Sequence, residues 1–195
     1  MFILKKQKLK DLYERGFSMK EIADNINCSS QKVVYWMNKF NIPRRTRSNA
    51  TYVKRNPNGD PFKIITPQNL KDAELKGYGL GLYWGEGTKK DPNSVRLGNT
   101  DPKLVKKFIE FLDKICGIKR EKLRFGLQIF NGINPRKAKK YWQNALTICE
   151  DQFMKKVVVI PPQGKGTYKN KSQYGVITVY YHNKKLKNKL MKMLG

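Results

Sequence analysis

The feature that most constrains this chain is an apolar run between Gly77 and Thr88 that also carries repeated glycines. The run reads GYGLGLYWGEGT, with glycines at positions 77, 79, 81 and 85. Its apolar content, with an approach from Gln68, predicts a helix, although each interior glycine costs a helix roughly 1 kcal/mol. A sequence tolerates that cost where two backbones must approach closely. We therefore expect a closely packed helix that ends at a single acidic residue, Glu86.

The charge balance indicates a polyanionic partner. The 195 residues hold 41 Lys+Arg against 15 Asp+Glu, a formal charge of +26. Residues 1–60 hold 13 basic and 5 acidic side chains, and residues 61–195 hold 28 and 10, so the excess is spread along the chain. Positive charges in such excess repel one another in a compact protein, and binding to nucleic acid neutralises them. We therefore expect nucleic acid as the partner. A ribosomal-type or membrane-surface protein is the alternative.

Cysteine usage and the first residues point to an intracellular protein. The three cysteines lie far apart and form no CxxC or Cys/His cluster, which argues against a zinc module or a disulfide framework. The opening run Met1–Leu4 is too short for a signal peptide or a membrane span. We expect a cytoplasmic, nucleoid-associated protein with no membrane partner.

The N-terminal segment predicts three short helices over residues 1–47. Ser18 and Glu21 have the spacing of a capping box, and Ser29 can cap a further helix that reaches about Phe40. Three such helices with a tight turn before the last make a helix-turn-helix, and the segment resembles the small helix-turn-helix domains of resolvases. In that arrangement the third helix enters the major groove. Its outward residues would be Ser30, Gln31, Lys32, Tyr35 and Lys39. The alternative is a small helical bundle that binds protein.

A basic and then Pro/Gly-rich stretch follows this segment. Arg44, Arg45 and Arg47 come directly after a proline, and basic arms of this kind can track a minor groove. A solvated charge run is an equally good interpretation. Residues 48–67, which include the NPNGDP stretch, predict a linker.

Residues beyond the glycine-rich run alternate between helical and strand patterns. We expect a hairpin over 88–99, a helix from Asp101 to Gly117, a strand over 122–130 and a helix opened by Asn134 and Pro135. Strands over 157–160 and 174–181, separated by a polar loop at 161–173, and a closing helix over 186–193 complete the chain.

The segment LGLYWGEG, residues 80–87, resembles the LAGLIDADG motif of homing endonucleases, and the resemblance extends over about residues 68–194. It implies an α+β domain over 68–195 with an αββαββα order, a saddle-shaped antiparallel sheet and one added helix. Glu86 matches the motif's metal-binding acid and Gly85 the position whose carbonyl helps to bind metal, whereas Trp84 departs from the motif's first Asp. The implied cofactor is Mg²⁺ or Mn²⁺. Glu86 can alternatively cap a helix or pair with a lysine.

The resemblance also implies a homodimer, since the motif occurs once and its helices pack in pairs. The implied interface residues are Gly77, Gly81, Leu82 and Gly85. The implied activity is site-specific cleavage of double-stranded DNA at a long, roughly palindromic site. Base contacts would come from Arg96, Arg124 and Gln128, and phosphate contacts from Lys89 and Lys90. The alternatives are a non-cleaving transcription regulator on the same fold and, less favoured, an RNA splicing maturase.

Overall fold

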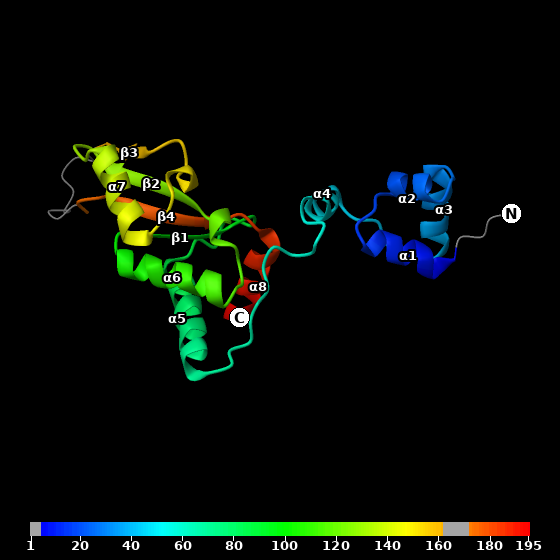
Figure 1. Ribbon diagram of the computed structural model, residues 1–195, viewed down its shortest axis with the longest axis horizontal. Helices are drawn as coiled ribbons and strands as arrows, with labels where there is room; N and C mark the ends of the chain where they lie inside the picture. The colour runs from blue at the N-terminus through cyan, green and yellow to red at the C-terminus, as the bar shows by residue number, and fades with distance from the viewer. Residues whose placement is uncertain (1–4, 162–171) are drawn as a thin grey trace. The chain divides into compact units, whose positions relative to one another are not determined.

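Helix caps that are visible in the sequence set the boundaries of many elements in the computed structural model, which describes residues 5–161 and 172–195. The chain divides into two units, Met1–Pro61 and Phe62–Gly195, and each unit has its own apolar core. Over the described residues the protein is α+β, with eight α-helices and one four-stranded sheet (Figure 1). The opening residues Met1–Leu4 and most of the polar loop expected at 161–173 lie outside the described residues.

The first unit contains the three expected helices, α1 (Lys6–Glu14), α2 (Met19–Asn25) and α3 (Ser30–Lys39). Ser18 and Glu21 form the full capping box at α2, and the Ser29 side chain accepts the Lys32 N–H at α3. Apolar residues at helical spacing from all three helices make a small core, which consists of Leu9, Leu12, Tyr13, Ile22, Ala23, Val33 and Met37. This core leaves the opposite side of α3 in solvent.

A fourth helix, α4 (Arg47–Arg55), lies where the sequence suggested a linker. The Thr46 side chain caps it by accepting the Asn49 N–H. Residues 47–55 contain neither glycine nor proline, and the breaker-rich stretch begins only at Asn56. Val53 of α4 packs against Gly16, whose φ of +103° and missing side chain make room for it. The linker prediction therefore began too early, because capping at Thr46 outweighs the polar composition that follows.

The second unit begins with an extended segment and the long helix α5 (Leu70–Glu86), followed by alternating strands and helices. In chain order these are β1 (Val95–Asn99), α6 (Pro102–Lys114), β2 (Arg124–Phe130), α7 (Pro135–Leu146), β3 (Val158–Ile160), β4 (Val176–Tyr181) and α8 (Lys184–Leu194). Short 3₁₀ turns cover Arg120–Lys122 and Glu150–Gln152. Asp101 and Asn134 cap α6 and α7, each followed by a proline in the first turn.

The sheet has the order β1-β4-β2-β3 and is mixed. Strand β4 pairs antiparallel with both neighbours, whereas β3 runs parallel to β2. The expected all-antiparallel sheet is therefore wrong at β3, because α7 carries the chain back across the sheet before β3 begins and so returns it in the same direction.

The expected hairpin over 88–99 forms only in part. Only β1 is a strand, and the first arm contributes a single bridge between Gly87 and Leu97 with a Thr88 N–H···O=C Arg96 bond of 3.0 Å. The Asp91 carboxylate accepts hydrogen bonds from the Asn93 N–H and the Ser94 hydroxyl, and these bonds hold the residues before β1 in a loop instead of a strand. The observed order is thus αβαβαββα and not the expected αββαββα with one added helix.

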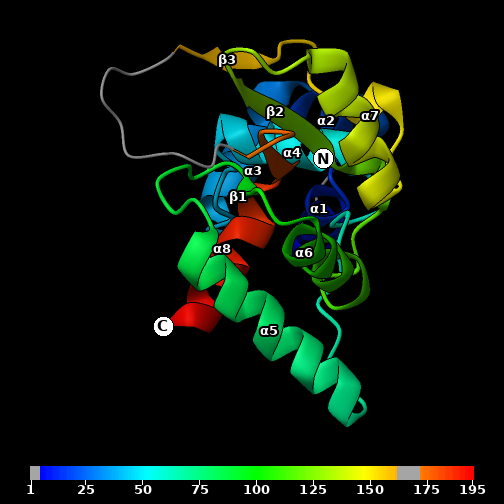
Figure 2. The same ribbon diagram turned by 90° about the vertical axis from the view of Figure 1, so that its left-hand side faces the viewer.

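Helices α6 and α7 pack on one face of the sheet and bury its apolar side chains. Leu97, Phe125, Ile177 and Val179 point into this core, which Phe108 and Trp142 help to fill. Helix α5 packs on α6 and reaches β1 and α8 with its C-terminal end (Figure 2). The side chains on the opposite face of the sheet, such as Arg96, Gln128 and Tyr180, are half-buried or exposed. The C-terminal end of α5 lies beside the edge strand β1, where Gly87 bridges Leu97.

Candidate nucleic-acid interface and catalytic carboxylate

Glu86 is the last residue of α5, and it is exposed. The final carbonyls of a helix lack partners within the helix and carry the negative end of its dipole, so this position favours a bound cation. The Lys89 ammonium already donates to the Trp84 carbonyl there. Among the described residues, no ion pair involves the Glu86 carboxylate. The carboxylate thus lies at a cation-favouring helix end without serving as a structural salt bridge.

The donor set at this helix end is compatible with a hard divalent cation but is incomplete in one chain. Glu86 offers a carboxylate and Gly85 a backbone carbonyl, which are the oxygen ligands that Mg²⁺ prefers. Within the described part of the chain, no three His, Cys, Asp or Glu side chains are grouped to hold a metal. A metal here would need further oxygen ligands from phosphate, water or a second copy of the chain.

The glycines of α5 fall into two classes. A Cβ on Gly79 would lie 2.0 Å from the Phe111 ring, so this glycine serves the packing of α5 on α6. Gly77, Gly81 and Gly85 have no atom within 4 Å of an added Cβ, and they form an open stripe at a spacing of four residues. Trp84, which is 71% exposed, lies on the same side of the helix. Leu82, the other expected interface residue, is half-buried and packs against the protein's own core.

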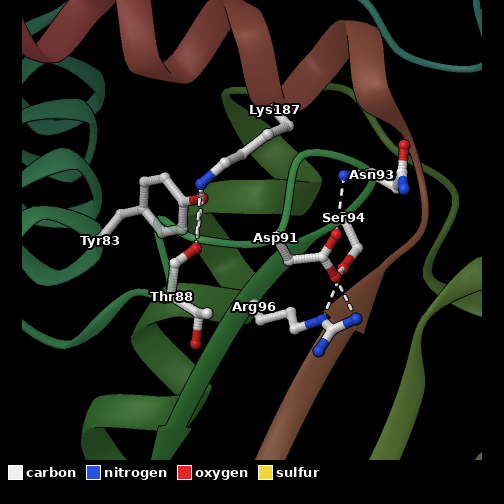
Figure 3. Close-up of polar contacts among 7 residues, drawn as sticks. All are labelled: Tyr83, Thr88, Asp91, Asn93, Ser94, Arg96 and Lys187. Atoms are coloured by element: carbon white, nitrogen blue, oxygen red, sulfur yellow. Dashed lines mark hydrogen bonds and ion pairs between the residues drawn. The ribbon is translucent and has the colours of Figure 1, made fainter.

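A buried lysine fixes the chain on both sides of Glu86 (Figure 3). Lys187 of α8 is 2% exposed, and its Nζ donates to Tyr83 Oη at 2.5 Å and to the Thr88 carbonyl at 2.9 Å. Burial, helped by the nearby Lys89 charge, lowers the pKa of Lys187. Burial also raises the pKa of Tyr83 to about 12, so the tyrosine keeps its proton. Lys187 thereby ties the last turn of α5 to the segment that follows it.

Sequence reasoning missed Lys187, although a signal for it exists. Lys187 follows Leu186 and precedes Leu190 by three residues, which places it within the apolar stripe of α8. A lysine inside such a stripe indicates either a snorkelling side chain or a buried ammonium with dedicated acceptors. Only the tertiary arrangement of Tyr83 and Thr88 distinguishes the two.

Asp91 organises the loop between α5 and β1. Its Oδ1 accepts the Asn93 N–H at 2.8 Å, and its Oδ2 accepts the Ser94 hydroxyl at 2.7 Å and pairs with the Arg96 guanidinium. The Asn93 N–H, the Ser94 hydroxyl and then the Arg96 charge hold the pKa of Asp91 below its ordinary value. The sequence predicts only a hairpin over 88–99 around this residue and does not indicate that Asp91 is an arginine partner.

The expected base-contacting residues lie on the open face of the sheet. Arg96 on β1 and Arg124 on β2 flank Tyr180 on β4 in one row, and the Arg96 guanidinium carbon lies 5.0 Å from the centre of the Tyr180 ring. Arg124 uses Nη1 to donate to the carbonyls of Glu121 and Leu123 at 2.7 and 2.8 Å. Gln128, farther along β2, is exposed.

The expected phosphate-contacting residues Lys89 and Lys90 are exposed on the loop that follows Glu86. They lie in the same loop as Asp91, which precedes the arginine row on β1. The second unit therefore brings Glu86, the loop lysines and the arginines of the sheet into one region of its own surface.

Four of the expected major-groove residues in the first unit share the outward side of α3, whereas Ser30, the first residue of the helix, has the helical spacing of the buried Val33 and Met37. Ser30, Gln31, Lys32, Tyr35 and Lys39 are all exposed. Trp36 is half-buried and stacks on Phe40, with 5.3 Å between the ring centres. The outward side of α3 is thus polar and basic with one exposed aromatic ring.

The basic residues after α3 separate into two kinds. Arg44 and Arg47 are exposed. Arg45 instead holds the chain against α1: its N–H donates to Tyr13 Oη at 2.7 Å, and its guanidinium carbon lies 4.0 Å from the Tyr13 ring centre. Its Nη1 also donates to the Phe17 carbonyl at 3.3 Å. The geometry gives Arg45 a packing role in place of membership in a free basic arm.

Comparison of the chain with family models, with curated proteins and with solved structures finds no match in any of the three. Among the helices that the structure describes, none is long and apolar enough to cross a membrane.

Proposed function

We propose that this protein is a site-specific, divalent-metal-dependent endonuclease of the homing-endonuclease kind, which cuts double-stranded DNA as a homodimer. The observation that carries the proposal is the end of α5, where an open glycine stripe leads to an exposed carboxylate at a cation-favouring helix end. The sheet face beside it presents arginines in a row. A net charge of +26 supports a nucleic acid as the substrate.

The glycine stripe supports pairing of two α5 helices. Gly77, Gly81 and Gly85 leave the backbone of α5 uncovered on one side, so a second helix can approach at short range. Tyr78 and Trp84 add exposed apolar surface along the same helix. A two-fold pair of this kind is isologous and brings two copies of Glu86 toward one axis. A symmetric dimer would read a roughly palindromic site.

The chemistry proposed at the paired carboxylates is hydrolysis of a phosphodiester bond. Bound Mg²⁺ would lower the pKa of a water molecule and neutralise charge on the phosphate. The Glu86 carboxylate would hold the cation, with the Gly85 carbonyl beside it. Lys187 would keep that helix end in place through Tyr83 and Thr88. Lys89 and Lys90 would hold neighbouring phosphates.

The exposed polar side of α3 supports a second candidate function, a DNA-binding transcription regulator that does not cut. Both functions require specific DNA binding, and they differ in whether Glu86 performs chemistry. A regulator has no need of an unpaired carboxylate at a helix C-terminus, where the dipole disfavours it. Glu86 therefore favours the endonuclease.

The test combines selection and cleavage. The preferred duplex is selected from random DNA without metal, and Mg²⁺ or Mn²⁺ is then added to the wild type, Glu86→Gln and Glu150→Gln. Glu150 is an exposed carboxylate outside this region and serves as the matched control. We expect double-strand cleavage by the wild type and by Glu150→Gln, and at least a 100-fold slower reaction with Glu86→Gln at equal or tighter affinity, roughly the loss of one major catalytic group. Specific binding without cleavage by the wild type would replace the endonuclease with the regulator.

A further inference from the structure

Arg96 is held on three sides by its own chain. Its Nε donates to Ser94 Oγ at 2.7 Å, its Nη2 pairs with Asp91, and the guanidinium lies over the ring of Tyr180. Ser94 is fully buried and itself donates to Asp91 at 2.7 Å, so the acceptor group is rigid. In Figure 3 the third guanidinium nitrogen, Nη1, points away from Asp91 and Ser94. One edge of the guanidinium is therefore fixed and the other is directed outward.

Two glycines lie in the sheet row beside this arginine. In the row next to Arg96, Tyr180 and Arg124, the residues are Gly98, Thr178 and Gly126. A Cβ on Gly98 would lie 2.8 Å from Thr178 Oγ1, and one on Gly126 would lie 3.0 Å from the Tyr180 ring. The two glycines therefore let Thr178 and the Tyr180 ring lie close against the sheet, where they support the arginine row.

We propose that Arg96 reads a guanine in the major groove and that Asp91 is the positioning residue that fixes its geometry. Arginine pairs in a bidentate way with guanine O6 and N7, which suits a guanidinium whose other edge is already anchored. The Arg96 guanidinium also makes a cation–π contact with the Tyr180 ring, which helps to fix its orientation. This inference rests on the proposed DNA-binding function and assigns part of its sequence preference.

Charge and geometry make opposite predictions for Asp91, which makes the inference testable. Removal of a negative charge near DNA strengthens binding to any sequence through simple electrostatics. Loss of the anchor lets the guanidinium rotate and weakens discrimination at one base pair only. Lysine in place of Arg96 keeps the charge but lacks the rigid planar fork of the guanidinium, which is what Asp91 and Ser94 hold in place.

The experiment selects preferred duplexes from random DNA, without metal, for the wild type, Asp91→Asn, Arg96→Lys and Glu110→Gln. Glu110 is the matched control, since its carboxylate is held by Lys107 and Lys114 on α6, away from the sheet face. Thermal unfolding of each variant reports whether it is folded. We expect the wild type to select a G·C pair at one position per half-site. Its affinity for that pair should exceed its affinity for the other pairs by about 5- to 150-fold, as one bidentate contact provides.

The supporting result is loss of that preference in both Asp91→Asn and Arg96→Lys, with all other positions unchanged and equal or tighter general affinity for Asp91→Asn. Glu110→Gln should keep the complete preference. An unchanged G·C preference in folded Asp91→Asn, or a uniform weakening at every position, would overturn the inference while leaving the DNA-binding proposal intact. Absence of any selected sequence for the wild type would overturn both.

Discussion

At the scale of single residues, buried Lys187 is the side chain whose placement has the largest structural consequence. Its ammonium is removed from water and receives two acceptors in return, the Tyr83 hydroxyl and the Thr88 carbonyl. Burying a charge is costly unless its hydrogen bonds are made. The arrangement links α8, the last turn of α5 and the segment after Glu86, so the position of the candidate catalytic carboxylate depends on a residue 101 positions away in sequence.

We expect Lys187→Met to destabilise the protein by about 1–3 kcal/mol, because the Tyr83 hydroxyl and the Thr88 carbonyl both lose the ammonium that donates to them. The double variant with Tyr83→Phe removes one acceptor of that ammonium as well, so its cost should fall below the sum of the two single costs by about 0.5–3 kcal/mol. Urea unfolding of the two single variants and the double variant measures this coupling. If the changes in the free energy of unfolding were strictly additive, the result would contradict a direct Lys187–Tyr83 interaction.

At the scale of elements, the glycines of α5 carry two functions on two sides of one helix. Gly79 lets α5 lie directly on Phe111 of α6, whereas Gly77 contacts nothing and belongs to the open stripe. The same substitution at these two positions therefore separates packing within the chain from pairing between chains. Both sites lie within the helix, so helix propensity changes equally in the two variants.

We expect Gly79→Ala to destabilise the chain by about 1–3 kcal/mol, since its Cβ would overlap the Phe111 ring. Gly77→Ala should instead stabilise the single chain by about 0.5–1 kcal/mol, because alanine is the better helix former and meets no neighbour. If α5 pairs with a second α5, Gly77→Ala should also weaken the dimer in sedimentation equilibrium. An unchanged dimer constant would remove Gly77 from the pairing surface.

Local signals in the sequence account for many of these elements and for the position of Glu86. Ser18, Asp101 and Asn134 each cap the helix that their sequence context predicts, because capping involves only neighbouring residues. The parallel placement of β3 was not predictable, since the pairing of β3 with β2 depends on the path of α7 and not on the residues of either strand. Lys187 was missed for the same reason: its acceptors come from another helix and a loop.

The sequence likewise could not predict which arginines are held by other groups of the chain. Arg45 and Arg96 have the sequence context of free basic residues, yet each holds an aromatic ring and an acceptor of its own chain. Sequence identifies a guanidinium that can contact DNA, but only the fold shows which edge of it is already occupied. The expected contact residues therefore divide into anchored ones, such as Arg96, and exposed ones, such as Gln31 and Lys32.

At the scale of the whole molecule, the excess positive charge is shared by both units. The first 60 residues contribute 13 basic and 5 acidic side chains, and the rest contribute 28 and 10. Each neutralised phosphate releases counterions, so the logarithm of the binding constant should fall linearly with the logarithm of salt concentration, with a slope of about −0.9 per contact. This dependence lets the contribution of the first unit be separated into phosphate contacts and base contacts.

Gln31 and Lys32 are adjacent, exposed and on the same turn of α3, so they form a matched pair for this separation. We expect Lys32→Ala to make the salt slope shallower by about 1 per bound chain and to leave the sequence preference unchanged. The reason is that a contact between lysine and phosphate does not depend on the base sequence. Gln31→Ala should leave the slope unchanged and relax the preference at one or two base pairs, since its amide can pair with adenine. Fluorescence anisotropy across a salt series, with selected and scrambled duplexes, measures both quantities. If neither variant alters slope or preference, α3 does not lie in the groove, and DNA binding then rests on the sheet face of the second unit.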